Sequence, residues 1–155
     1  MENNIYYHIY NRGVAKQDIK VDDNDLNHLL ITFVYYLENS PKLKLSLLPK
    51  NDLNPLIEKT VNQPLVEIIA FCLMPNHFHL IVKELVEKGA ITFIKRSLNS
   101  YSRFFNTKYD RVGPLFQGRS KKVIVDTDAY LLHLSRYVHL NPFMAKLCIK
   151  PEKYP

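Results

Sequence analysis

Two strand-like runs joined by only three residues constrain the fold of this chain more than any other feature. Residues 66–73 (VEIIAFCL) are almost continuously apolar, residues 77–82 (HFHLIV) follow them, and Met74-Pro75-Asn76 lies between. Parallel strands need a crossover of a dozen or more residues, so this short connection predicts an antiparallel pair. The apolar character of 66–73 also predicts a strand in the middle of a sheet.

Helical periodicity predicts three helices, at about residues 22–38, 90–106 and 128–140. Acidic and hydroxyl side chains are placed to cap the first and the last, and Asn141-Pro142 ends or bends the last. In the second helix the apolar positions at helical spacing are Ile91, Ile94, Leu98, Tyr101 and Phe105.

The order of elements predicts the fold class. Residues 5–11 and 122–125 are rich in aromatic or β-branched side chains and indicate two more strands. The resulting order β-α-β-β-α-β-α matches the α+β, ferredoxin-like split βαβ arrangement, an antiparallel sheet with helices on one side and an extra C-terminal helix. We expect a single domain over residues 1–155, with a proline-containing loop insertion at about 40–64.

Composition narrows the class of protein. No run approaches the roughly 20 apolar residues of a membrane span, and the polar start of the chain is unlike a signal peptide. Cys72 and Cys148 lie among apolar neighbours and indicate free thiols in a reducing compartment. We therefore expect a cytoplasmic protein with no membrane partner.

Positive charge is concentrated in residues 95–122. This segment has eight basic residues and one acidic residue, a net charge of +7, whereas the whole chain carries +6. Aromatic residues are interleaved with the charges, as in proteins that bind single-stranded nucleic acid, although a solvated basic face and core aromatics are the plain alternative. The residues predicted to contact phosphate are Arg12, Arg103, Arg111, Arg119, Lys121 and Lys122.

His77 and His79 are the first candidates for chemistry. Alternate residues of a strand point to the same face, so these imidazoles can form a pair of metal ligands while Phe78 enters the core. The alternative is two half-buried histidines that are hydrogen-bonded to neighbours.

The last predicted helix carries the other candidates. His133, Tyr137 and Asn141 are spaced i, i+4, i+8 and share one face, opposite the apolar Leu134 and Val138. If this helix packs over the sheet, the Asn141 amide oxygen becomes a third metal ligand and the Tyr137 phenol lies next to the ion as a nucleophile. His133 is a possible helper in activating that phenol.

Five segments together resemble the single-tyrosine HUH transposases, with the REP-associated tyrosine transposases as the nearest branch. They are residues 7–13 (YHIYNRG), 73–81 (LMPNHFHLI), 101–106 (YSRFFN), 113–119 (GPLFQGR) and 136–142 (RYVHLNP). Phe116 departs from the Trp of many relatives, and the chain ends at Tyr154-Pro155 where relatives usually continue.

The resemblance implies an enzyme that cuts and rejoins single-stranded DNA, often beside a hairpin, through a covalent 5′-phosphotyrosine. It assigns Tyr137 as the nucleophile and His77, His79 and Asn141 as ligands of Mg²⁺ or Mn²⁺. Whether the protein acts as a monomer or a homodimer stays open.

Three other interpretations of the sequence stay open. One is a domesticated DNA-hairpin-binding protein that no longer cuts. Another is a replication-initiation or relaxase-type nickase with the same histidine chemistry. The third is a ferredoxin-like RNA-binding module in which the histidines are only structural.

Overall fold

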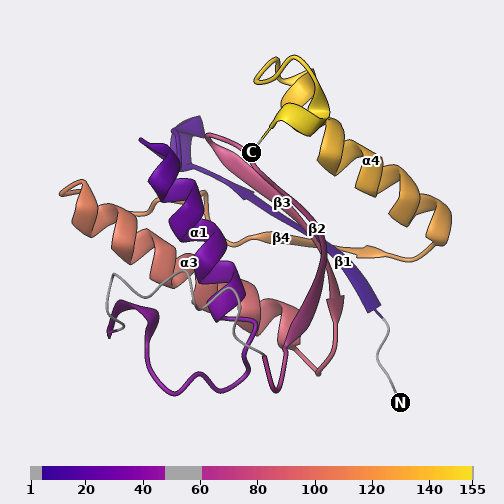
Figure 1. Cartoon of the computed structure of the whole chain (residues 1–155). Coiled ribbons are helices and arrows are strands. Elements are labelled where there is room, and N and C mark those ends of the chain that lie inside the picture. Colours follow the sequence, from indigo (N-terminus) through magenta and orange to yellow (C-terminus); the bar gives the residue numbers. More distant parts are fainter. Residues whose placement is uncertain (1–4, 48–60, 155) are drawn as a thin grey trace.

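Four strands form one antiparallel sheet in the order β2-β3-β1-β4 (Figure 1). The structure is a computed structural model that describes residues 5–47 and 61–154. The strands are β1 (Ile5–Arg12), β2 (Val66–Leu73), β3 (His77–Glu84) and β4 (Lys121–Val125). Both central strands, β3 and β1, pair with antiparallel neighbours on each side. This strand order confirms the predicted ferredoxin-like arrangement.

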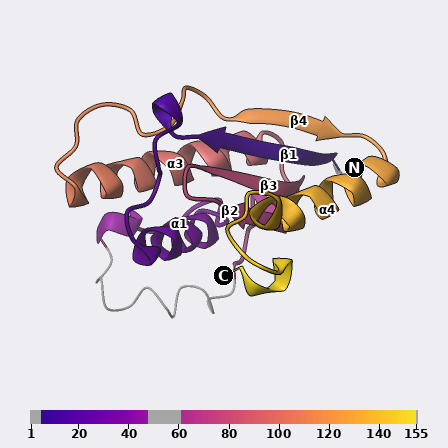
Figure 2. The same ribbon diagram turned by 90° about the horizontal axis from the view of Figure 1, so that it is seen from above.

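Helices cover both faces of the sheet. The helices α1 (Asp23–Tyr35) and α3 (Gly89–Lys108) lie on one face, and α4 (Asp128–Met144) lies on the other (Figures 1 and 2). The larger core lies under α1 and α3 and includes the fully buried Phe33, Phe78 and Phe93. A smaller core, with Ile81, Leu134 and Val138, lies under α4. The short 3₁₀ turns are Val14–Lys16, Leu45–Leu47 and Pro151–Lys153.

The caps predicted for the first and last helices are present. At the start of α1 the Asp22 carboxylate accepts from the backbone N–H of Asp25, and the Asp25 carboxylate accepts from the backbone N–H of Asp22. At the start of α4 the Thr127 hydroxyl accepts from the N–H of Tyr130. The Asp25 carboxylate also binds Lys108 and Tyr109, and so it joins α1 to the end of α3.

The strand β2 lies at the edge of the sheet, so its predicted central place was wrong. Its apolar run has a different cause: side chains of β2 enter the larger core on one face and the smaller core on the other. Near its middle, Ile69 and Phe71 remain 41% and 44% exposed, and the pairing register shifts between Ile68 and Ala70. A strand that is covered on both faces has an apolar sequence whether or not both of its edges are paired.

Helix details also differ from the prediction. Ile91 is exposed, whereas Phe93 is fully buried and belongs to the stripe that faces the sheet. The helix α4 continues through Pro142 to Met144, and Pro142 extends the buried stripe of Leu134 and Val138 by one turn. The N–H of Ala145 donates to the carbonyl of Asn141 across the proline. The first helix ends at Tyr35, three residues earlier than expected.

The predicted insertion at 40–64 falls partly outside the described residues. Its described part contains the 3₁₀ turn Leu45–Leu47, and residues 48–60 lie outside. Within the described parts of the chain, no helix is long and apolar enough to cross a membrane.

Candidate active site

The register of the sheet places both histidines of β3 on the face that α4 covers. His77 pairs with Arg12 and His79 with Tyr10, whereas Phe78, between them in sequence, is fully buried in the larger core. On the far side of Tyr10, Lys121 of β4 continues the same row of side chains. Residues paired in register share a face, so imidazole, phenol and cationic groups gather on this side of the sheet.

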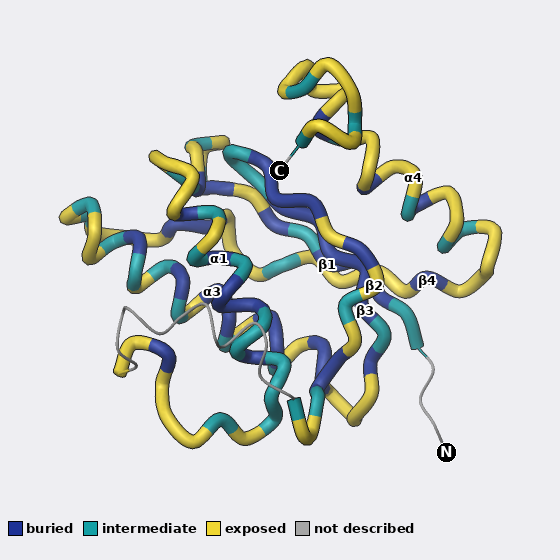
Figure 3. Tube along the Cα trace, viewed as in Figure 1, coloured by how far each residue is buried: buried dark blue, intermediate teal, exposed yellow. Residues whose placement is uncertain are grey.

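The helix α4 is anchored over this face by Leu134 and Val138, which are 5% and 0% exposed. Tyr137 precedes Val138 and remains 48% exposed, while most of the outer surface of α4 faces solvent (Figure 3). The Tyr137 ring lies edge-on to the His79 ring, with 5.4 Å between the ring centroids. A rigid helix therefore holds an accessible phenol beside an imidazole of the sheet.

Asn141 lies one turn beyond Tyr137 and interacts with the His77 ring. His133 lies one turn before Tyr137 and is exposed, and no hydrogen bond within the described residues involves its side chain. The structure thus brings together His77, His79, Tyr137 and Asn141, as the sequence predicts. Their roles in metal binding and catalysis, and that of His133, stay predictions.

Both imidazoles of β3 have their Nδ1 atoms engaged. The Nδ1 of His77 lies 2.6 Å from the Asn76 amide oxygen, which only accepts, so this nitrogen carries the proton. The Nδ1 of His79 lies 2.9 Å from the Nε2 of His8, and either ring can be the donor in that pair. The Nε2 of His77 therefore carries no proton and has a lone pair, as a metal ligand requires.

Burial keeps these histidines neutral. It is the largest influence on His79, and with the nearby His8, His77 and Arg12 it lowers the pKa of that imidazole to about 3. Burial also lowers the pKa of His77, with Arg12 acting in the same direction and Asn141 in the opposite one. Burial alone lowers the pKa of His8. Metal binding requires unprotonated imidazole, so the site is in its competent form at neutral pH.

The side chains present fit a divalent ion with open coordination positions. Two neutral imidazoles have their ring centroids 5.2 Å apart, and Asn141 adds an amide beside one of them. Among the described residues no group of three or more His, Cys, Asp or Glu is placed to hold a metal. Any metal site here therefore depends on the amide and on ligands from solvent or substrate.

The cationic residues predicted to contact phosphate fall into two groups. Arg12 and Lys121 are exposed on the site face, and Arg119 is exposed in the loop that runs from α3 to β4 and is hydrogen-bonded to the end of β1. That loop is held in place because the Gln117 N–H donates to the Arg12 carbonyl and the Asn11 amide donates to the Gly118 carbonyl.

The other three predicted cations lie away from Tyr137. Arg103 is exposed on α3, on the opposite face of the sheet. Arg111 donates to Asn106 and Gln17. The Lys122 ammonium lies 4.0 Å from the centre of the Tyr7 ring, on the face away from the site.

Sequence reasoning missed three residues of the site: His8, Tyr10 and Asn76. His8 and Tyr10 share the site face of β1 with Arg12, and their rings lie near that of His79, at centroid distances of 5.1 and 5.8 Å. The alternation His8, Tyr10, Arg12 was the available signal, because three polar or aromatic residues at every second position of a central strand need partners.

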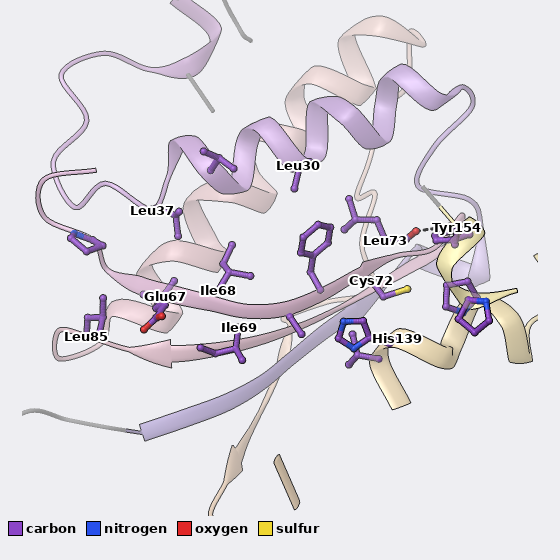
Figure 4. Close-up of a pocket in the computed structure, with 18 residues that line it drawn as sticks. Leu30, Leu37, Glu67, Ile68, Ile69, Cys72, Leu73, Leu85, His139 and Tyr154 are labelled. Atoms are coloured by element: carbon purple, nitrogen blue, oxygen red, sulfur yellow. Dashed lines mark hydrogen bonds between the residues drawn. The ribbon is translucent and has the colours of Figure 1, made fainter. Parts of the chain in front are cut away.

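A large apolar groove lies elsewhere, along the outer edge of β2 (Figure 4). Its walls come from α1, β2 and the C-terminal residues, where the Tyr154 hydroxyl donates to the Leu73 carbonyl. His139 faces this groove, whereas the lining among the described residues includes neither His77, His79 nor Tyr137. The polar cluster, and not this apolar groove, therefore marks the candidate active site.

The fold and this cluster together define a ferredoxin-like protein with a histidine pair on the sheet and a tyrosine on the helix above it. The family described as "Transposase IS200 like" matches residues 28–141. The chain belongs to this family of IS200-like transposases, as its motifs predicted.

Matches to solved structures include the following two. One, a REP-associated tyrosine transposase bound to a REP hairpin, is 12% identical with a TM-score of 0.60, and the match covers 100% of this chain and 76% of that one. The other is a "putative transposase" from Deinococcus radiodurans R1, 12% identical with a TM-score of 0.49, covering 86% of this chain and 87% of that one. No curated protein matches the sequence.

Proposed function

We propose that this protein cuts and rejoins single-stranded DNA, with Tyr137 as the nucleophile and a divalent metal ion held by His77, His79 and Asn141. The observation that supports this most is the exposed Tyr137 phenol beside the buried His79 ring, at a centroid distance of 5.4 Å. An exposed phenol can meet a phosphodiester from solvent, and rigid neighbours can orient that phosphodiester for attack.

In the proposed reaction the Tyr137 oxygen attacks the phosphorus of a DNA phosphodiester. The bond from phosphorus to the 3′ oxygen breaks, the 5′ phosphate stays on the tyrosine, and the leaving oxygen takes up a proton to become a 3′-OH. An ordinary phenol has a pKa of about 10, so the attacking group needs a base or water to take its proton. His133, one turn away, is a candidate for that role.

Rejoining is the same exchange in reverse. A 3′-OH attacks the phosphotyrosine, the bond between phosphorus and the Tyr137 oxygen breaks, and the phenol regains its proton. Because the phosphotyrosine conserves the phosphodiester bond, no ATP is consumed. A bound Mg²⁺ or Mn²⁺ would supply Lewis-acid polarisation of the phosphate, and two imidazole ligands suit Mn²⁺ somewhat better.

The DNA would lie across the site face of the sheet. Arg12 and Lys121 lie in rows next to the two histidines, and Arg119 is exposed two residues before Lys121, so exposed cations are available near the candidate centre. The similar solved transposase is bound to a REP hairpin, which supports a hairpin-bearing single strand as the substrate class. A DNA-cutting protein of this kind would act at the nucleoid in the cytoplasm.

A covalent-trapping assay tests the proposal. End-labelled single-stranded hairpin DNAs are incubated with the protein and Mn²⁺ or Mg²⁺, and denaturing gels are run beside EDTA and Tyr137→Phe samples. Tyr130→Phe is the matched control, because Tyr130 lies on the same helix but packs against the smaller core. An adduct that needs metal and Tyr137 but not the Tyr130 hydroxyl is expected. Binding without an adduct across the panel would favour a non-cutting hairpin-binding protein.

A further inference from the structure

A buried hydrogen bond joins the His8 ring of β1 to the His79 ring of β3, which is one of the proposed metal ligands. Their nitrogen atoms lie 2.9 Å apart, and each side chain is only 7% exposed. His8 pairs in register with Ile81 and Val123, whereas His79 pairs with Tyr10. His8 therefore lies diagonally across from His79 on the neighbouring strand. The two rings are nearly parallel, with 21° between their planes.

Only one of the two possible proton arrangements leaves His79 able to bind a metal. If His8 donated through Nε2, the neutral His79 ring would carry its proton on Nε2 and would have no lone pair there for an ion. If His79 donates through Nδ1 instead, its Nε2 is free. His77 is already in the second arrangement, because its Nδ1 faces the Asn76 oxygen at 2.6 Å.

We propose that His8 is a positioning residue that accepts the Nδ1 proton of His79 and so holds that ring in the orientation and tautomer that present Nε2 to a divalent ion. This inference rests on the metal site of the proposed function. His8 is not itself a ligand, because its Nε2 is occupied by His79 and its ring lies against Tyr10, at a centroid distance of 4.8 Å.

The arrangement gives both histidines of β3 the same kind of support from different neighbours. A hydrogen bond to the second nitrogen fixes the ring plane and raises the basicity of the ligating one. For His77 the acceptor comes from the adjacent residue of the chain, whereas for His79 it comes from a different strand, 71 residues earlier. Pairing of β1 with β3 is therefore needed to complete the candidate metal site.

The test uses Mn²⁺ alone, without DNA. Free Mn²⁺ is measured by electron paramagnetic resonance during titration of the protein, and the tautomer of His79 is read from ¹⁵N–¹H correlation spectra of the metal-free protein. His8→Phe keeps a planar ring but removes the acceptor. His8→Gln places an amide oxygen near the position of Nε2. His28→Phe is the matched control, since His28 stacks on Phe104 on the opposite face of the sheet.

Loss of such a supporting hydrogen bond typically lowers metal affinity 10–100-fold. We expect a loss of about this size in His8→Phe, recovery of most of it in His8→Gln, and no change in His28→Phe. The spectra are expected to show His79 protonated on Nδ1 in the wild type and shifted towards the Nε2–H form in His8→Phe.

The outcomes separate this inference from the proposed function. Equal Mn²⁺ affinity in the wild type and His8→Phe would overturn it while leaving the metal site intact. If the wild type binds no Mn²⁺, the proposed metal site fails, and the wild-type spectrum still decides whether His8 sets the tautomer. A wild-type His79 protonated on Nε2 overturns the inference, even if His8→Phe does not fold.

Discussion

Lowering the pH should affect metal binding at His77 and His79 far less than at a pair of ordinary histidines. An imidazole with a pKa of 6.5 is about 97% protonated at pH 5, so it loses metal affinity by a factor of about 30. Two such ligands would lose about 1,000-fold between pH 8 and pH 5. Burial, reinforced by nearby positive charge, lowers the pKa of His79 to about 3, so this ligand should lose almost nothing.

The remaining loss of metal affinity comes from protonation of His77. The pKa of His77 is also lowered, first by burial and then by Arg12. Its contribution must therefore be smaller than that of an ordinary histidine, and the total loss should stay below about 30-fold. Mn²⁺ titrations followed by electron paramagnetic resonance at pH 8, 6.5 and 5 measure this directly. Circular dichroism at each pH checks that the protein is folded, and Tyr137→Phe, which keeps all proposed ligands, should show the same dependence.

A loss near 1,000-fold in folded protein would refute this reasoning. It would mean that both imidazoles titrate as they do in water, and hence that burial under α4 does not protect them.

Two further predictions concern stability and DNA binding. His79 and His28, with pKa values lowered by burial to about 3 and about 4, stay neutral in the folded chain while the unfolded chain takes up protons below pH 6.5. The free energy of unfolding should therefore fall by about 1.4 kcal/mol per pH unit for each of them as the pH drops from 6.5 towards 4, and urea titrations should show a shallower fall in His28→Phe. For DNA, Arg12→Gln should reduce the slope of log affinity against log salt for single-stranded DNA by about 1, and Arg103→Gln should change it less. Equal effects of the two substitutions in fluorescence anisotropy would contradict the placement of DNA on the site face.

Local patterns predicted the elements of this fold well because each depends on residues close in sequence. The three-residue connection between β2 and β3 permits only an antiparallel pair, and that pair is present. The alternation in β3 placed His77 and His79 on one face and Phe78 in the core. Helical spacing likewise placed Tyr137 and Asn141 together, beside His79 and His77. The prediction that Leu134 and Val138 lie on the opposite side of α4 was wrong, because they pack on the same face of the sheet that carries these histidines.

Features that depend on distant partners were not predictable in the same way. The sequence of β2 shows that both of its faces are covered but not that it lies at the edge of the described sheet. The bond between His8 and His79 depends on the register of β1 against β3, which no local pattern specifies. Charge alone grouped Arg111 with Arg119, although Arg111 is hydrogen-bonded to Gln17 and Asn106 within the fold.

Peptide mapping of a trapped protein–DNA adduct by mass spectrometry tests the central claim most directly. After incubation with Mn²⁺ and a hairpin DNA that yields an adduct, the protein is digested and the peptide that carries the nucleotide is sequenced. We expect a 5′-phosphate linked to the Tyr137 oxygen, with a free 3′-OH on the released strand. Linkage to another residue, or cleavage that leaves no covalent product, would contradict the proposed mechanism.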